Sequence, residues 1–187
     1  MENQNSVKFI LGITVKLLLI SVVTALLLAC VNALTENRIA ENIAKEKEDA
    51  IAAIFPSADA NSSVELEAEG INALYLVYSN DKAIGYTAEV APLGFGGEIT
   101  LMVGVNVNGE VTGVKLISHS ETPGLGSRVG DAGYLAKYIG KDGSALEGGV
   151  DVITGSTVSS KAVLEGVKAA VSVFDTVYPM FVSGGAK

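Results

Sequence analysis

The sequence feature that most constrains the fold is a run of 18 residues without a charge, residues 17–34. As an α-helix this run is about 27 Å long, close to the ~30 Å hydrocarbon thickness of a bilayer. Lys16 can extend its ammonium group toward the headgroups, so the apolar residues before it can lie at the interface. The sequence therefore predicts a cytoplasmic tail over residues 1–8 and a transmembrane helix over residues 9–34.

The same region also fits a cleaved secretory signal. Lys8 and Lys16 would be its charged part, and Leu27-Leu28-Ala29-Cys30 is similar to a lipoprotein cleavage site. Apolar residues continue beyond Cys30, which favours a retained helix. Both alternatives place the remaining chain outside the cytoplasm if the N-terminus stays inside. The predicted location is therefore the cell membrane, with one pass and an extracytoplasmic domain.

The composition of the chain beyond the apolar run argues against several classes of protein. Residues 36–187 carry 11 basic and 20 acidic side chains, whereas a nucleic-acid partner needs positive charge. Cys30 is the only cysteine, so an internal disulfide and a zinc or iron–sulfur site built on cysteines are excluded. His119 is the only histidine and no G-x-S-x-G motif is present near residues 154–160, which argues against a Ser-His-Asp hydrolase. We expect no metal ligands and no catalytic residue.

Helical periodicity continues beyond the predicted membrane span. Isoleucines interleave with charged residues over residues 35–54, and Phe55-Pro56 ends the pattern. We interpret residues 35–56 as a helical stalk, although a surface helix of the domain predicts nearly the same pattern. Residues 57–187 then form one domain.

Strand signals dominate the first half of that domain. Residues 73–78 and 83–90 flank a polar turn, and residues 99–107 and 110–118 flank Asn108-Gly109. Asn-Gly between apolar runs predicts a type I′ hairpin, in which both central residues take positive φ. We expect four antiparallel strands, with residues 61–70 as a loop or edge segment.

The second half of the domain is predicted to be mostly helical. A short helix is expected around Tyr134 and Tyr138, a loop over residues 142–149, and a last strand over residues 149–153. A final helix should start at Thr157, continue to about Thr176 and end at Pro179. The fold class is therefore α+β, an antiparallel sheet packed by helices behind a transmembrane helix and stalk.

Residues 151–160 combine an acidic residue, a glycine and several hydroxyls ahead of the final helix. Thr157 should stand at the helix N-terminus, where backbone N–H groups lack intrahelical partners and the macrodipole favours an anion. The residue types therefore suit a phosphate, although a hydroxyl residue at this place is also an ordinary helix cap.

A second unusual segment covers residues 121–126, Glu-Thr-Pro-Gly-Leu-Gly. The proline fixes φ, while the glycines allow the backbone to approach a ligand closely. The dinucleotide glycine fingerprint is absent and the segment follows a hairpin strand, so a Rossmann site is excluded. A turn-rich surface loop remains the alternative.

Together, residues 119–126 and 151–157 resemble the FMN-binding domain of the G subunit of Rnf complexes and of the related C subunit of the sodium-translocating NADH:quinone reductase. The family's flavinylation motif is Asp, two variable residues, Ser or Thr, Gly, Ala and the acceptor Thr. Ser156 stands where alanine is usual, and we expect attachment to survive this change. The resemblance covers nearly the whole chain, including the membrane helix and the stalk.

The resemblance implies that Thr157 carries FMN through a phosphoester bond, which a separate flavin transferase installs from FAD with magnesium. Asp151 is then expected to serve the transferase or the magnesium ion. The expected contacts of the phosphate are Thr154, Gly155, Ser156, Ser159 and Ser160, and those of the flavin ring and ribityl chain are Glu121, Thr122, Gly124, Leu125, Gly126, Gly94, Phe95 and Gly96.

The function implied is that of a membrane-anchored electron carrier in an Rnf complex, which passes electrons between ferredoxin and NAD and moves Na⁺ or H⁺. Its partners would be the other subunits, the transferase and membrane lipid, and it would have no complete activity alone. One alternative is the C-type subunit of the quinone reductase. Another is a non-redox tethered binding module or lipoprotein, in which Thr157 is only a cap.

Overall fold

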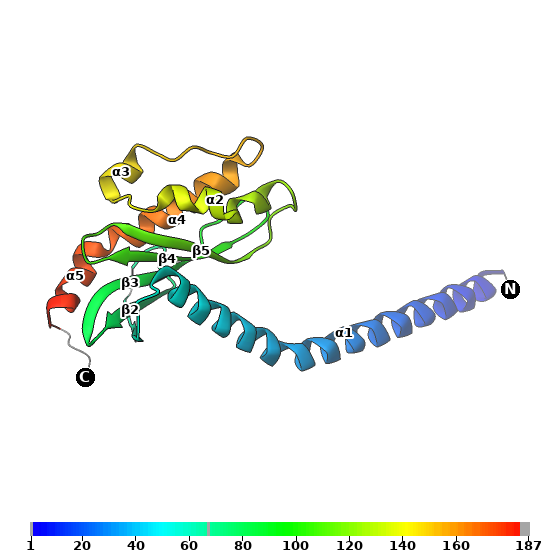
Figure 1. The fold of residues 1–187 in the computed structure, drawn as a ribbon. Helices are drawn as coiled ribbons and strands as arrows, with labels where there is room; N and C mark the ends of the chain where they lie inside the picture. The colour runs from blue at the N-terminus through cyan, green and yellow to red at the C-terminus, as the bar shows by residue number, and fades with distance from the viewer. Residues whose placement is uncertain (1, 67, 184–187) are drawn as a thin grey trace. The chain divides into compact units, whose positions relative to one another are not determined.

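The computed structural model describes residues 2–66 and 68–183. The chain divides into two compact units, Met1–Lys45 and Glu46–Lys187. Helix α1 (Glu2–Ile54) forms the first unit and supplies the first residues of the second (Figure 1). The predicted helix through the span and on to Ile54 is therefore confirmed.

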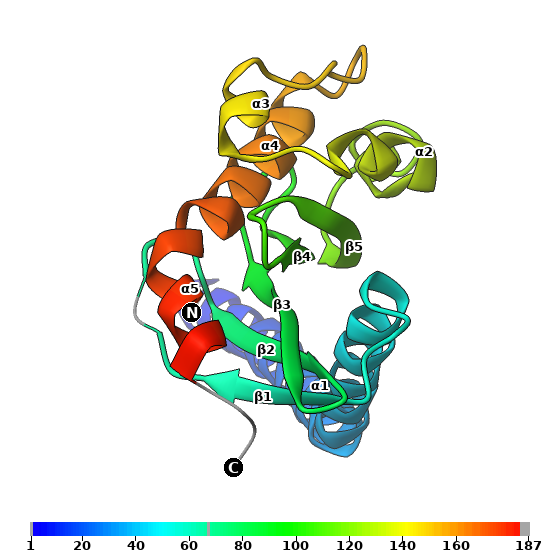
Figure 2. The same ribbon diagram turned by 60° about the vertical axis from the view of Figure 1, so that its left-hand side comes forward.

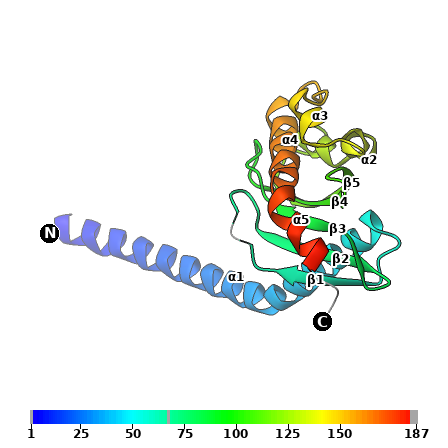
Figure 3. The same cartoon turned by 90° about the vertical axis from the view of Figure 1, so that its left-hand side faces the viewer.

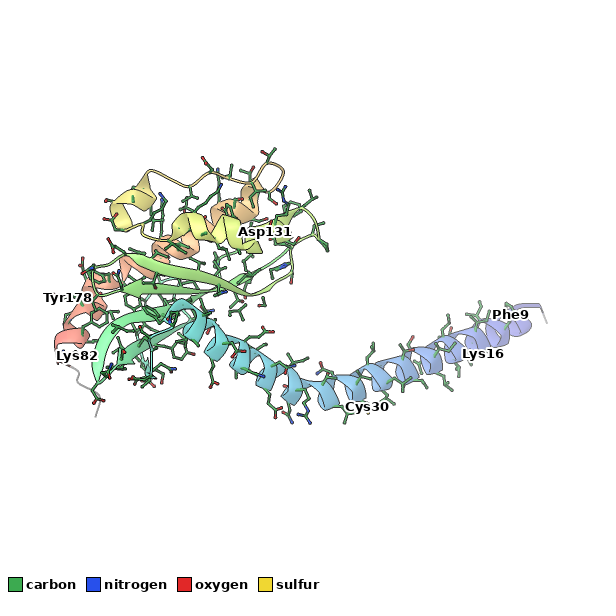
Figure 4. The ribbon with its side chains drawn as sticks, viewed as in Figure 1. Phe9, Lys16, Cys30, Lys82, Asp131 and Tyr178 are labelled. Carbon is green, nitrogen blue, oxygen red and sulfur yellow. The ribbon has the colours of Figure 1, made fainter. Side chains whose placement is uncertain are left out.

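In the first unit, the apolar side chains of α1 from Phe9 to Leu34 are exposed. Figure 4 shows the side chains of Phe9, Lys16 and Cys30 projecting from the helix. The hydroxyls of Thr14 and Thr24 donate to carbonyl oxygens four residues earlier, at 3.0 and 2.9 Å. Such bonds satisfy hydroxyls where no water is present. Among the described residues, α1 is the one helix long and apolar enough to cross a membrane.

The second unit contains a five-stranded antiparallel sheet in the order β1-β2-β3-β4-β5. Each strand pairs with the one before it in sequence, so the sheet is a meander (Figure 2). The strands are β1 (Ala60–Val64), β2 (Ala73–Ser79), β3 (Lys82–Val90), β4 (Ile99–Asn106) and β5 (Val111–His119). The α+β prediction is confirmed, and the segment predicted as a loop or edge contributes β1 as a fifth, edge strand.

The remaining elements follow the sheet in sequence. They are η1 (Gly126–Gly130), α2 (Ala132–Leu135), η2 (Ala136–Tyr138), α3 (Gly143–Glu147), α4 (Thr157–Ser172) and α5 (Phe174–Ser183). Figure 3 shows α4 leading directly into α5. The predicted short helix around Tyr134 and Tyr138 is confirmed by α2 and η2.

The main core lies between the sheet and α4. Val163, Val167 and Ala170 of α4 are fully buried in one apolar cluster with Tyr86 and Val103 of the strands. The Tyr86 hydroxyl donates to the Ala170 carbonyl oxygen at 2.7 Å. Burial of this apolar face gives α4 its stability and fixes where its N-terminus lies.

The opposite face of the sheet holds the end of α1. Ile51, Ile54 and Phe55 form a second buried cluster with Val77 and Met102. Residues 46–54, which the sequence placed in a stalk, therefore pack into the same unit as the sheet.

The first predicted hairpin is confirmed, whereas the turn type of the second was wrong. Asn80 and Asp81 both have positive φ between β2 and β3. Between β4 and β5, only Gly109 has positive φ. The Asn106 side-chain oxygen accepts from the Asn108 and Glu110 amides at 2.8 and 3.0 Å. These bonds favour a three-residue loop with a glycine bulge over the two-residue type I′ turn.

The structure corrects three further predictions in the C-terminal half. The loop predicted over residues 142–149 contains α3, because the Asp142 carboxylate accepts from the Ala145 amide at 2.8 Å and caps it. No strand forms at residues 149–153; Ile153 bonds locally, its N–H donating to the Ser160 hydroxyl and its carbonyl accepting from the Ser156 amide. The final helix breaks at Val173, and Pro179 lies inside α5 instead of ending α4.

An ion pair joins the end of α1 to the sheet and gives a testable prediction. Lys47 Nζ lies 2.7 Å from Glu89 Oε2, and both side chains are largely buried. The Lys47→Met change leaves the Glu89 carboxylate buried without its cation, so we expect a loss of about 2 kcal/mol in the free energy of unfolding. The measurement is denaturant unfolding of the full chain in detergent.

The matched control for Lys47→Met is Arg38→Met. It breaks an exposed pair, Arg38 with Glu41 at 3.2 Å, and should change stability by less than about 0.5 kcal/mol. Equal effects of the two changes would show that the Lys47–Glu89 pair does not hold α1 against the sheet.

Candidate functional site

A pocket of about 400 Å³ lies where two loops meet the N-terminus of α4. One loop, residues 94–97, follows β3, and the other, residues 121–126, follows β5. The resemblance assigned residues of all three segments to one ligand site, and the fold brings the segments together. The pocket is lined by Phe95, Glu121, Thr122, Leu125, Gly126, Gly155, Ser156, Thr157, Val158 and Ser159.

Thr157 is the first residue of α4 and its side chain is exposed, which confirms its predicted place. Ser156 is the N-cap, and its carbonyl oxygen accepts from the Ser160 amide at 2.9 Å. Gly155 has a φ of +84°, which reverses the chain just before the helix. The first backbone N–H groups of α4 therefore have no intrahelical acceptor and lie beside the pocket, at the positive end of the helix dipole.

The hydroxyl side chains around Thr157 differ in their bonding. Ser156 Oγ is buried and has no hydrogen-bond partner. Ser159 Oγ donates to Glu121 Oε2 at 2.8 Å, and Ser160 Oγ accepts from the Ile153 amide at 3.1 Å. Of the predicted phosphate contacts, Gly155, Ser156 and Ser159 line the pocket, whereas Thr154 and Ser160 do not.

Glu121 is the buried charge of the site, with 4% of its surface exposed. Its Oε1 atom accepts from the Phe95 amide at 2.7 Å and from the Gly96 amide at 3.0 Å. Burial raises the pKa of this carboxyl, but the bonds from the Gly96 amide, the Ser159 hydroxyl and the Phe95 amide outweigh burial and hold the pKa below its ordinary value. The Glu121 carboxylate is therefore ionised at neutral pH.

Glycines make room for this carboxylate. A Cβ atom at Gly94 would overlap Glu121 Oε1, and a Cβ atom at Gly126 would overlap Glu121 Oε2. At Gly96 a Cβ atom would overlap the Ser120 carbonyl oxygen. The two glycine loops approach each other closely around the Glu121 side chain because neither carries a side chain at these points.

The mouth of the pocket is apolar and open. Phe95, Leu125 and Val158 line it with 76%, 53% and 52% of their surfaces exposed. Exposed apolar side chains grouped around a pocket are typical of a ligand site. Their surfaces suit a planar aromatic group, while the α4 amides suit an anion, so the pocket fits a ligand with an aromatic ring system and an anionic group.

Several predicted site residues lie near the pocket without lining it. Gly94 and Gly96 belong to the first loop, and the Gly124 amide donates to Ser127 Oγ at 2.9 Å. Asp151 is exposed on the segment before the turn. Its carboxylate does not line the pocket.

The sequence missed two features of the site. Val158 was not predicted to be a site residue, yet its side chain is half exposed at the pocket mouth. The bond from Ser159 to Glu121 joins residues 38 apart in sequence, and no spacing rule indicates it.

Two family models match the chain. The model described as FMN-binding domain matches residues 94–172 and so spans the pocket-forming segments. The model described as RnfG N-terminal region matches residues 5–54, the length of α1.

Among curated proteins, the chain is 31% identical to the G subunit of the Na⁺-translocating ferredoxin:NAD⁺ oxidoreductase complex of Acetobacterium woodii, over 84% of this chain and 88% of that one. It is 29% identical to the G subunit of the proton-translocating ferredoxin:NAD⁺ oxidoreductase complex of Clostridium ljungdahlii, over 94% and 95% of the two chains. The crystal structure of NqrC from Shewanella oneidensis has the same fold, with a TM-score of 0.50, 21% identity, and 69% of this chain and 73% of that chain covered.

Proposed function

The chain belongs to the family of G subunits of ion-translocating Rnf complexes, and we propose that it carries electrons in such a complex through FMN covalently bound to Thr157. The observation that supports this most strongly is the exposed Thr157 hydroxyl at the first residue of α4, inside a pocket with an apolar mouth. The pocket lies within the region that matches the FMN-binding domain. The complex would couple electron transfer between ferredoxin and NAD to movement of Na⁺ or H⁺, as the names of the relatives state.

Thr157 supplies the atom that a phosphoester needs. A separate flavin transferase would join the Thr157 oxygen to the FMN phosphorus of FAD. The pyrophosphate bond of FAD would break, AMP would leave, and the hydroxyl proton would be released. The free amides at the start of α4 then hold the phosphate oxygens, since these N–H groups have no intrahelical acceptor. Asp151, exposed outside the pocket, would serve the transferase or its magnesium ion.

The walls of the pocket would hold the rest of the cofactor. Phe95, Leu125 and Val158 offer apolar surface to the ring system, and Thr122 offers a hydroxyl. Bound FMN supplies the electron chemistry, and the protein supplies placement and tuning. A covalent bond suits this open pocket, because a weakly held flavin would be lost to the surroundings.

The setting of the protein is part of the proposal. Helix α1 would cross the cell membrane once, in contact with lipid, and would hold the domain on the extracytoplasmic side. The other subunits of the complex are its partners. The match over residues 5–54 to the RnfG N-terminal region favours an Rnf complex over the quinone reductase, because the likeness to NqrC concerns the fold.

The proposal is tested by producing the full chain together with a flavin transferase. We expect a yellow-green fluorescent band at the mass of the chain on a denaturing gel, since a phosphoester survives denaturation. A dark band in the presence of active transferase would contradict the proposal. An intact mass that shows cleavage before Cys30, lipidation and no FMN would instead support the tethered lipoprotein.

Ser156 gives a prediction about the one departure from the family motif. Because Ser156 Oγ is buried without a partner, the Ser156→Ala change should leave stability unchanged or raise it by about 1 kcal/mol. Flavin attachment should persist, since the backbone of Ser156 makes the cap and its hydroxyl makes no bond. Gel fluorescence and thermal unfolding check both parts. A non-fluorescent Ser156→Ala chain would show that this hydroxyl takes part in attachment.

A further inference from the structure

The Glu121 carboxylate joins three segments that are separate in sequence. Oε1 accepts from the amides of Phe95 and Gly96 in the first loop, and Oε2 accepts from the Ser159 hydroxyl in the first turn of α4. Glu121 itself begins the second loop, and its own amide donates to His119 Nδ1 at 3.1 Å. One side chain therefore sets the separation of all three walls of the pocket.

The carboxylate is also a charge without a cationic partner. Among the ion pairs of the described residues, none includes Glu121. Its three donors are two amides and a hydroxyl, and all three are neutral. The side chain is 4% exposed and lines the pocket. A bound group thus meets a negative charge that solvent screens poorly.

On the basis of the FMN site proposed above, we propose that Glu121 is a positioning residue with two effects. Its hydrogen bonds hold the loop of residues 94–97 against α4 and so pre-form the pocket. Its fixed negative charge makes the bound flavin harder to reduce, because reduction adds electrons beside an existing negative charge in a poorly screened site. The reduction potential of the flavin is therefore lower than it would be in the same pocket without this charge.

The Glu121→Gln variant separates these two effects. The amide oxygen of glutamine can still accept from the Phe95 and Gly96 amides. Its NH₂ group can donate to Ser159 Oγ, so the serine hydroxyl becomes the acceptor of this bond instead of its donor. The pocket is retained and the charge is removed. The matched control is Glu98→Gln, which removes an exposed carboxylate next to the loop of residues 94–97. Solvent screens the charge of Glu98, so its removal should affect the flavin only weakly.

The measurement is the midpoint potential of the covalent flavin in the full chain in detergent, by spectroelectrochemical titration. We expect Glu121→Gln to raise the midpoint potential of the flavin. At a fixed solution potential, the ratio of reduced to oxidised flavin should rise roughly tenfold, which is about 30 mV for a two-electron couple. Glu98→Gln should change it by less than a third of that. A Glu121→Gln potential equal to that of the wild type, or a shift as large for Glu98→Gln, would overturn the charge effect.

The positioning effect is measured without the flavin. In the Thr157→Ala background, Glu121→Ala should speed hydrogen exchange of the Phe95 and Gly96 amides at least tenfold, whereas Glu121→Gln should preserve their protection. Unchanged exchange in Glu121→Ala would overturn the positioning effect, whatever the flavin content. A failure of the FMN proposal is distinct, because then the wild-type chain itself carries no covalent flavin.

Discussion

The Thr157→Ala chain is expected to carry no covalent flavin while the domain stays folded. The change removes the only atom through which Thr157 can form a phosphoester. It costs little stability, because Thr157 is exposed and the helix is capped by Ser156; alanine is a good residue in a first helical turn. We expect complete loss of fluorescence on a denaturing gel and a change in unfolding free energy within about 0.5 kcal/mol.

Two variants control for the Thr157→Ala result. Thr157→Ser keeps a hydroxyl at the same backbone position and should restore part of the fluorescence. Thr176→Ala removes an exposed hydroxyl in α5 and should leave the fluorescence at the wild-type level. Fluorescence that persists in Thr157→Ala would mean that another residue carries the flavin.

Gly85→Ala is expected to cause a large loss of stability. A Cβ atom at Gly85 in β3 would overlap the backbone carbonyl oxygen of Val105, and it would lie 2.8 Å from the Phe55 ring. The carbonyl belongs to β4, which pairs with β3, so it cannot move without disturbing the sheet. We expect a loss of about 3 kcal/mol, seen as a thermal midpoint lower by about 10 °C.

The matched control for Gly85→Ala is Gly133→Ala. Gly133 lies in α2, and a Cβ atom there would meet no atom within 4 Å. Alanine is a better helix former than glycine, so stability should be unchanged or slightly higher. A thermal midpoint for Gly85→Ala as high as that for Gly133→Ala would show that the Val105 carbonyl and the Phe55 ring do not lie as close to Gly85 as the structure has them.

The sequence predicted correctly those turns and helix ends whose conformation is set by the residues within them. The polar turn around Asn80 and Asp81 specifies its hairpin because both residues tolerate positive φ. The start of α4 was predicted because a glycine turn and hydroxyl residues precede a regular apolar face. The length of the first helix followed from its apolar content and from the stop at Pro56.

Predictions failed where the contacts of a segment cannot be read from its own residue pattern. Residues 149–153 have strand-like composition, but their backbone bonds to the turn at Ser156 and Ser160 instead of the sheet. The break at Val173 separates α4 from α5, whose aromatic side chains pack together around Phe181. The end of α1 was assigned to a stalk because its charged pattern does not reveal that Ile54 and Phe55 pack on the sheet.

The sequence predicted which segments form the candidate site, but it did not predict how their side chains contact one another. The sequence assigned Glu121 and Ser159 to separate flavin contacts, whereas the structure shows them bonded to each other. The Ser159 hydroxyl donates its hydrogen bond to the Glu121 carboxylate, so this donor is already used within the protein. Only the fold shows that the charge of Glu121 lies in the wall of the pocket.

The most direct test of covalent FMN on Thr157 is peptide mass mapping of the chain purified from the cell membrane. Cleavage after Lys141 and Lys161 releases residues 142–161, which contain Thr157 together with Ser144, Thr154, Ser156, Ser159 and Ser160. We expect this peptide to carry the mass of FMN, with fragmentation that locates the modification at Thr157. An unmodified peptide, or FMN located at one of the other five hydroxyl residues, would contradict the assignment.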